Sequence, residues 1–309
     1  MPSSWDQWRA QEQGDEAMKI LISDAFDPSL PERLAKFGEV FDDKARVAEA
    51  DVVLVRSKTK CTKEYIDGAP NLKLIIRGGV GLDNIDLEYA KQKGIEVRNT
   101  PQASSVAVAE LAMALMLALP NHIVKGSNSM HSGEWLKKQC KRSELFKKTL
   151  GLIGLGRIGY EVAKRARAFG MDVIAYDVVR ADQDAASYVE TLEELLSRAD
   201  YISLHTPLTE QTKGMINTDL IARMKDGVFM VNTGRGKCVN EADLAEALKS
   251  GKIAAYGNDV WYSDPPESSP LIGLPNVVAL PHIGASTNEN LLRIGDVIVE
   301  TIEEFNAKN

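Results

Sequence analysis

Three polar side chains in the second half of the chain are of the types that move a proton and hold a carboxylate. His282 lies in the segment Pro281-His-Ile-Gly-Ala-Ser-Thr287, and histidine is the natural base near neutral pH. Asp264 is a candidate partner that would hold the imidazole in one tautomer. Arg235, between two glycines, carries the planar fork that binds a carboxylate through paired hydrogen bonds. Each residue alone fits a turn or a cap equally well, but together they indicate acid–base chemistry on a small acid.

These side chains and Asp259 follow short apolar segments that we interpret as strands of one parallel sheet. The segments are Tyr201–Leu204, Gly227–Val231, Ile253–Asn258 and Asn276–Leu280, and helical patterns separate most of them. Ligands bind beyond the carboxyl ends of the strands in such a sheet. We therefore expect Arg235, Asp259, Asp264 and His282 to meet at one edge.

The same sheet is expected to contain a glycine motif. An apolar strand from Thr149 leads into Gly154-Leu-Gly156-Arg-Ile-Gly159, a helix is expected over Tyr160–Phe169, and a further strand, Met171–Tyr176, ends at Asp177. The first glycine permits a tight turn, the second lets backbone amides approach a pyrophosphate, and the third lets helix and strand pack closely. The order of strand, glycines, helix, strand and acid indicates a dinucleotide site rather than a glycine-rich turn in a cofactor-free fold.

Asp177 indicates NAD, because a carboxylate there accepts hydrogen bonds from ribose hydroxyls and repels a 2′-phosphate. Arg180 is the feature that would favour the phosphorylated cofactor instead. With a nicotinamide at the sheet edge, His282 could take the hydroxyl proton of a secondary alcohol as its hydride leaves. Asp259 would orient the nicotinamide through its carboxamide.

Apolar strands and helical patterns also alternate before the glycine motif, which predicts a smaller parallel domain. We expect a disordered tail at residues 1–17, a substrate-binding domain from 18–100 and 287–309, and a NAD-binding domain over 101–286. The predicted fold class is α/β, with a doubly wound Rossmann domain and a smaller flavodoxin-like domain. An apolar helix is expected over Gln102–Leu119, and the basic stretch Val124–Lys148 is interpreted as a solvated linker, or alternatively as a source of cations that attract an anionic substrate.

The composition is that of an ordinary globular protein. The 309 residues are 44% hydrophobic and 26% charged with a net charge of −7, which favours neither nucleic acid nor an anionic membrane as a partner. The three cysteines, Cys61, Cys140 and Cys238, have no zinc-binding or disulfide spacing, so we expect no metal and a reducing, cytoplasmic location. Cys238 lies close to Arg235, and we interpret it as a buried core residue rather than a reactive thiol.

From Met18 onward the chain resembles the D-isomer-specific 2-hydroxyacid dehydrogenases. The matching motifs are Gly154-Leu-Gly-Arg-Ile-Gly159, His205-Thr-Pro207, Asn232-Thr-Gly-Arg-Gly236, Gly257-Asn-Asp-Val260 and the His282 segment. Within this family it is most similar to the phosphoglycerate dehydrogenases, through Val55-Arg-Ser-Lys-Thr59, Arg77-Gly-Gly-Val-Gly-Leu-Asp-Asn-Ile-Asp86, Asn99-Thr-Pro101 and Val108-Ala-Glu110. The chain ends soon after the matching core, so we expect neither a C-terminal regulatory domain nor feedback by serine.

The resemblance implies roles for further residues. Arg56 and Ser57 would contact the substrate, the amides of Gly79, Val80 and Gly81 would hold its carboxylate, and Asn99 would add a hydrogen bond; Arg235 and His282 complete this set. NAD contacts would fall on Val80, Val108, Gly154, Gly156, Arg157, Ile158, Gly159, Asp177, His205, Thr206, Pro207, Thr233, Gly234, Asp259, His282 and Gly284. Two departures are Asp264, where the family has glutamate, and Lys58, where some relatives have arginine.

The activity that the resemblance implies is reversible oxidation of 3-phospho-D-glycerate to 3-phosphohydroxypyruvate with NAD, in serine synthesis. A glyoxylate/hydroxypyruvate reductase or a D-lactate-type dehydrogenase is the alternative within the family. An NAD-sensing binding protein, like the transcriptional corepressors of similar fold, is the alternative outside enzymes. The resemblance also implies a homodimer, formed through the apolar helix 102–119 and the stretch that follows it.

Overall fold

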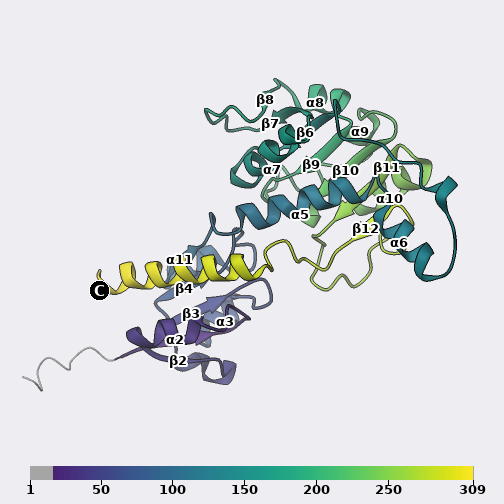
Figure 1. The fold of residues 1–309 in the computed structure, drawn as a ribbon. Helices are drawn as coiled ribbons and strands as arrows, with labels where there is room; N and C mark the ends of the chain where they lie inside the picture. Colours follow the sequence, from purple (N-terminus) through teal and green to yellow (C-terminus); the bar gives the residue numbers. More distant parts are fainter. Residues whose placement is uncertain (1–16, 309) are drawn as a thin grey trace, which may run out of the picture. The chain divides into compact units, whose positions relative to one another are not determined.

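The computed structural model describes residues 17–308, so the predicted tail lies outside the described residues except for residue 17. The chain divides into two compact units, Met1–Ala103 with Asn288–Asn309, and Ser104–Thr287. We call them the first and the second unit (Figure 1). The sequence predicts domain boundaries at residues 100/101 and 286/287.

The first unit is built on a parallel sheet with strand order β2-β1-β3-β4-β5. The strands are β1 (Met18–Ile22), β2 (Gly38–Phe41), β3 (Val52–Val55), β4 (Leu74–Arg77) and β5 (Glu96–Asn99). β3 is buried along its whole length, because helices cover both faces of the sheet. This is the flavodoxin-like strand order. The chain adds β2 on one side of β1 and the later strands on the other side, so the switch point lies between β1 and β3. The edge strand β2 was not predicted, because its half-exposed sequence has no apolar run.

Short helices and the long C-terminal helix complete the first unit. They are α2 (Leu30–Leu34), η1 (Ala35–Phe37), η2 (Lys44–Glu49), α3 (Lys63–Asp67), α4 (Leu87–Gln92) and α11 (Asn288–Asn306). α11, drawn in yellow in Figure 1, buries Ile294, Ile298 and Ile302 at a spacing of four residues, which is one face of a helix. These three side chains join the core formed by the sheet and α2, which returns the end of the chain to its beginning.

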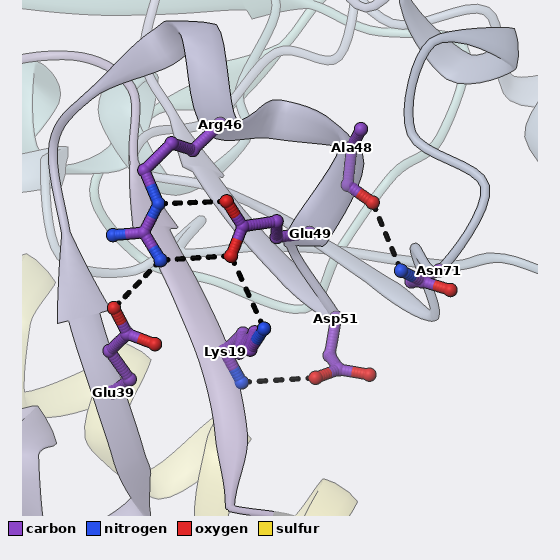
Figure 2. Close-up of polar contacts among 7 residues, drawn as sticks. All are labelled: Lys19, Glu39, Arg46, Ala48, Glu49, Asp51 and Asn71. Atoms are coloured by element: carbon purple, nitrogen blue, oxygen red, sulfur yellow. Dashed lines mark hydrogen bonds and ion pairs between the residues drawn. The ribbon is translucent and has the colours of Figure 1, made fainter.

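Ion pairs fasten the amino-terminal edge of this sheet. The guanidinium of Arg46 binds both carboxylate oxygens of Glu49, at 2.9 Å each, and reaches Glu39 at 2.8 Å (Figure 2). Lys19 donates its ammonium to Glu49 at 3.2 Å and its amide to Asp51 at 3.0 Å. Because ligands bind at the opposite, carboxyl edge of parallel sheets, this network serves the fold rather than a site.

The second unit contains a parallel sheet with strand order β12-β11-β10-β9-β6-β7-β8. The strands are β6 (Thr149–Ile153), β7 (Asp172–Tyr176), β8 (Ser187–Tyr188), β9 (Tyr201–Leu204), β10 (Val228–Asn232), β11 (Ile253–Asn258) and β12 (Val277–Ala279). The sequence predicted all of them except β8, which has only two residues. The order reverses between β6 and β9, as in a Rossmann domain, and this reversal marks the expected crevice for a dinucleotide.

The helices of the second unit correct two predicted boundaries and one interpretation. They are α5 (Ser105–Ala118), α6 (Ile123–His131), η3 (Lys137–Gln139), α7 (Arg157–Ala168), α8 (Leu192–Arg198), α9 (Thr218–Ala222), η4 (Gly236–Cys238) and α10 (Glu241–Ser250). α5 starts after Gln102 and α7 starts before Tyr160. The stretch interpreted as a linker begins with a helix, α6, whose one buried residue is Ser129.

None of the helices in residues 17–308 is by itself long and apolar enough to cross a membrane. α5 and α6 meet that requirement only as a pair, and they are bent by 66° where they join. Most of α5 is buried within the second unit, where it packs along α7 and the sheet.

Candidate active site

The glycine motif forms the turn from β6 into α7. Gly154 has a φ of +94°, and a Cβ there would lie 2.8 Å from the carbonyl oxygen of His205. A Cβ on Gly159 would lie 2.4 Å from the carbonyl oxygen of Gly154. Gly156, in contrast, faces open space within 4 Å, at the first turn of α7. Two glycines are thus required for close packing of the turn, and the third leaves room for a pyrophosphate at the helix N-terminus.

Asp177 lies at the end of β7 beside this turn. One of its carboxylate oxygens accepts a 2.7 Å hydrogen bond from the amide of Leu155, and the other accepts a 3.0 Å bond from Val179. A hollow of about 660 Å³ opens at the glycine turn and is lined by Leu155, Gly156, Arg157, Tyr160 and residues 181–184. The carboxylate is therefore held at the end of β7 beside the glycine turn, and its contact with a ribose stays a prediction.

The loops after β9 and β10 hold buried polar atoms that lack a partner among the described residues. The Nδ1 atom of His205 and the hydroxyl of Thr233 are both buried without a hydrogen bond. The other ring nitrogen of His205 contacts Ser203 at 2.9 Å, and burial lowers the pKa of His205 to about 4, so the ring is neutral. A buried polar group without a partner calls for an explanation, and a bound ligand is one of them. The residues present therefore fit a dinucleotide.

His282 lies in the loop after β12, where its Nδ1 contacts a carboxylate oxygen of Asp264. The structure thus brings together the two residues that the sequence paired, with the shorter aspartate spanning the gap. His282 has a φ of +55°, a left-handed conformation that costs a non-glycine residue about 1–3 kcal/mol. The side chain of His282 is 34% exposed and that of Asp264 is 38% exposed, so the pair is partly open to solvent.

Asp259 supports the loop that carries His282. Its two carboxylate oxygens accept 2.8 Å hydrogen bonds from the amides of Ile283 and Gly284. Burial raises the pKa of Asp259, and these two amide bonds act in the opposite direction. The contact of Asp259 with a nicotinamide carboxamide stays a prediction. The structure shows a further role that the sequence did not suggest, because Asp259 fixes the backbone next to His282. Val108, on α5, lies near Gly284.

Arg235 projects from the loop after β10, and Asn232 shapes this loop. The amide nitrogen of the fully buried Asn232 side chain donates to the Arg235 carbonyl at 3.0 Å, and its oxygen accepts from the Gly234 amide at 2.9 Å. The Arg235 guanidinium itself donates to the Gly234 carbonyl at 2.8 Å. Sequence reasoning gave Asn232 no role, although a polar residue that ends an apolar strand is the signal that would have found it.

The candidate substrate residues of the first unit also meet at one sheet edge. Arg56 and Ser57 follow β3, residues 79–81 follow β4, and Asn99 ends β5. Asn99 donates its side-chain amide to the carbonyl of Val80, and the amide of Thr100 donates to the carbonyl of Gly79 at 3.1 Å. The turn that would receive a carboxylate is thus held by the neighbouring strand.

The described residues contain no group of three or more His, Cys, Asp or Glu side chains arranged to hold a metal ion. The acid–base pair, the arginine and the glycine turn of the second unit instead suit transfer of a hydride and a proton. NAD supplies the hydride acceptor in this chemistry. The chain supplies binding, orientation and a place for the proton.

Comparison with known proteins agrees with this geometry. Residues 113–284 match the sequence model of the D-isomer specific 2-hydroxyacid dehydrogenase NAD binding domain. The chain is 52% identical over 259 residues to a hydroxypyruvate reductase of Thermotoga maritima, covering 83% of this chain and 85% of that protein. It is 45% identical over 299 residues to a D-3-phosphoglycerate dehydrogenase of Methanocaldococcus jannaschii, covering 93% of this chain and 57% of that protein.

A solved structure of a dehydrogenase with bound NAD has a similar fold. The D-lactate dehydrogenase of Aquifex aeolicus, complexed with NAD and lactic acid, superposes with a TM-score of 0.84 at 33% identity, covering 94% of this chain and 96% of that one. The chain spans a little over half the length of the archaeal phosphoglycerate dehydrogenase that it matches. The chain belongs to the D-isomer-specific 2-hydroxyacid dehydrogenases, and its cofactor is NAD.

Proposed function

We propose that the protein interconverts 3-phospho-D-glycerate and 3-phosphohydroxypyruvate with NAD. The observation that supports a dehydrogenase is the contact between His282 and Asp264 at the sheet edge that also bears Arg235. In the oxidative direction His282 takes the proton of the C2 hydroxyl at Nε2, because Asp264 occupies Nδ1. Arg235 holds the substrate carboxylate and polarises the carbonyl that forms.

The loop of residues 56–59 supports a phosphorylated substrate. It presents Arg56 and the exposed Lys58 at the same carboxyl edge of the sheet as the turn that would bind the carboxylate. Two cations at this edge suit an acid that carries a phosphate as a second anionic group. The archaeal relative at 45% identity is named as an enzyme of this kind.

Hydroxypyruvate reduction is the second candidate, supported by the Thermotoga maritima relative at 52% identity. The two substrates differ only by the phosphate, so the residues discussed for the second unit serve both equally. The choice between them depends on whether a cation of the first unit binds a phosphate. Lys58 is the candidate for that contact.

Steady-state reduction of a panel of 2-keto acids with NADH tests this proposal. We expect 3-phosphohydroxypyruvate to have a higher kcat/KM than hydroxypyruvate, glyoxylate or pyruvate. Lys58→Met should lower kcat/KM for the phosphorylated acid alone, and Lys60→Met, which removes a neighbouring exposed cation, is the control. A preference of the wild type for hydroxypyruvate would favour the second candidate. Tight NADH binding without turnover of any acid would favour an NAD-sensing binding protein.

We also propose a homodimer that works in the cytoplasm. Large apolar side chains on α6 and in the segment that follows it are exposed, namely Ile123, Val124, Met130, Trp135 and Phe146, and such residues suit an interface between two copies. Sedimentation equilibrium of Trp135→Glu, expected to be monomeric, tests this. All three cysteines are free, as suits a reducing compartment. There the reaction would supply serine synthesis.

A further inference from the structure

The backbone of residues 56–59 in the first unit is held from two sides by two side chains of other loops. Asp24, after β1, accepts hydrogen bonds from the amides of Arg56 at 2.6 Å and Thr59 at 3.1 Å. Asn84, after β4, donates to the carbonyls of the same two residues, at 2.8 Å and 2.6 Å. Both ends of this four-residue loop are therefore fixed, and Ser57 and Lys58 are left exposed between them.

Asp24 is a buried acidic residue whose carboxylate is fully engaged in hydrogen bonds to the loop of residues 56–59. Its side chain is 3% exposed, and it also accepts a 2.7 Å bond from the hydroxyl of Thr59. The ammonium of Lys44 lies 3.7 Å from the carboxylate and supplies a counter-charge. Burial by itself would raise the pKa of Asp24, but the bonds from Arg56 and Thr59 outweigh it and lower that pKa. The ionised carboxylate is thus matched to this loop.

The position of Asp24 follows from the sheet. β1 and β3 are parallel neighbours with Leu21 opposite Val53 and Ile22 opposite Leu54, so the same register places Asp24 opposite Arg56. The strand order reverses between these two strands, and ligands of such sheets bind at that point. The loop held by Asp24 therefore lies at the ligand-binding edge of the first unit.

We propose that Asp24 and Asn84 are positioning residues for the acid substrate, which act by holding the loop of residues 56–59 in its binding conformation. This inference rests on the proposed function only in assigning substrate contact to Arg56. The backbone carbonyl of Asn84 also accepts a 2.8 Å hydrogen bond from the amide of Cys61, so the loop after β4 is joined to the chain that follows residues 56–59 as well. Neither side chain needs to touch the substrate. We call Asp24 and Asn84, with their hydrogen bonds to residues 56–59, the clamp. Loss of either side chain lowers the fraction of molecules in which this loop has its binding conformation.

The test is a comparison of Asp24→Asn and Asn84→Ala with a matched control. An asparagine keeps the size of Asp24 but directs an amide group at one of its donors, so we expect the KM of the acid substrate to rise roughly tenfold to a hundredfold, the cost of one or more charge-assisted bonds. The kcat at saturation and the NADH dissociation constant should change less than about twofold, because the variant weakens binding of the acid substrate and leaves the chemical step and the cofactor site intact. Asp51→Asn is the control, since Asp51 also accepts a backbone amide, that of Lys19, but at the amino edge (Figure 2).

A second measurement reads the loop directly. Hydrogen exchange of the amides of Arg56 and Thr59 should accelerate in Asp24→Asn and not in Asp51→Asn. If Asp24→Asn does not fold, Thr59→Val removes one bond to the carboxylate and should raise the KM in the same direction. An unchanged KM, or unchanged exchange, in variants that fold refutes the clamp.

The clamp and the proposed function fail in different ways. The wild-type keto-acid panel decides the substrate, and the clamp is measured with whichever acid is turned over. Arg56→Ala separates the two further. If it raises the KM and Asp24→Asn does not, the clamp is wrong; if it leaves the KM unchanged, the assignment of Arg56 to the substrate is wrong.

Discussion

Replacing Asp259 by alanine tests how the fold prepares His282. The change removes the acceptor of two 2.8 Å amide bonds in the loop that carries the histidine. The amide of Gly284 is buried and would stay unpaired, at about 1–3 kcal/mol, whereas Ile283 is 41% exposed and its amide can turn to water. We therefore expect a loss of stability of about 1–3 kcal/mol.

The effect on turnover follows from the backbone of His282. Its left-handed conformation, with a φ of +55°, costs about 1–3 kcal/mol, and the two amide bonds to Asp259 stabilise it. Without them the loop relaxes to a lower-energy conformation, and the catalytic one becomes a minor state. A difference of about 1.4–2.8 kcal/mol corresponds to a kcat lower by tenfold to a hundredfold.

The assay is the kcat for the preferred keto acid together with the melting temperature, in the wild-type and His282→Ala backgrounds. If Asp259 acts through His282, its replacement lowers kcat only when the histidine is present, and lowers the melting temperature in both. Asp200→Ala is the control, because Asp200 accepts the amide of Thr149 at 2.9 Å at the opposite edge of the same sheet and should affect stability alone. An equal loss of kcat in both backgrounds, or a normal kcat in a destabilised Asp259→Ala, would refute the reasoning.

Three further predictions concern the cofactor, the base and the fold. His282→Ala should reduce kcat by at least a thousandfold, roughly, with an NADH dissociation constant close to that of the wild type by fluorescence titration; normal turnover would remove the histidine from the mechanism. Glu190→Gln should raise the NADP/NAD ratio of kcat/KM about three- to tenfold, because the Glu190 carboxylate pairs with both terminal nitrogens of Arg180, at 3.0 and 3.1 Å, and a neutral glutamine leaves the charge of the arginine available to a 2′-phosphate; an unchanged ratio would contradict this. Glu49→Gln should lower the melting temperature at pH 7 without changing kcat. Hydrogen bonds from Arg46 first, then from Lys19, lower the pKa of Glu49 to about 2, so the stability it contributes is present above about pH 4.5, its ordinary pKa, and is lost as the pH falls toward 2. The difference between variant and wild type in a melting series from pH 7 to 2 should therefore shrink below pH 4.5, and a constant difference would contradict the assignment.

The order of the elements could be predicted because it depends on local patterns. Continuous apolar runs such as 52–55 and 149–153 are typical of strands buried on both faces, and the glycine spacing at 154–159 requires a particular turn. The elements that the sequence did not predict lack such patterns. β2 and β8 are short or half-exposed edge strands, and α6 has only three apolar residues, set mostly among small and polar ones.

The residue types by themselves determined that an acid, a base and an arginine follow neighbouring strands of a parallel sheet, and that Asp177 ends a strand near the glycine turn. The tertiary structure decided which groups meet. Only the fold brings Asp264 to the Nδ1 of His282, directs both oxygens of Asp259 to the amides beside that histidine, and places Asp24 under a loop more than 30 residues away in the chain. A single sequence carries local preferences and spacing, whereas these contacts depend on strand register and on loops whose shape is set by hydrogen bonds between distant segments.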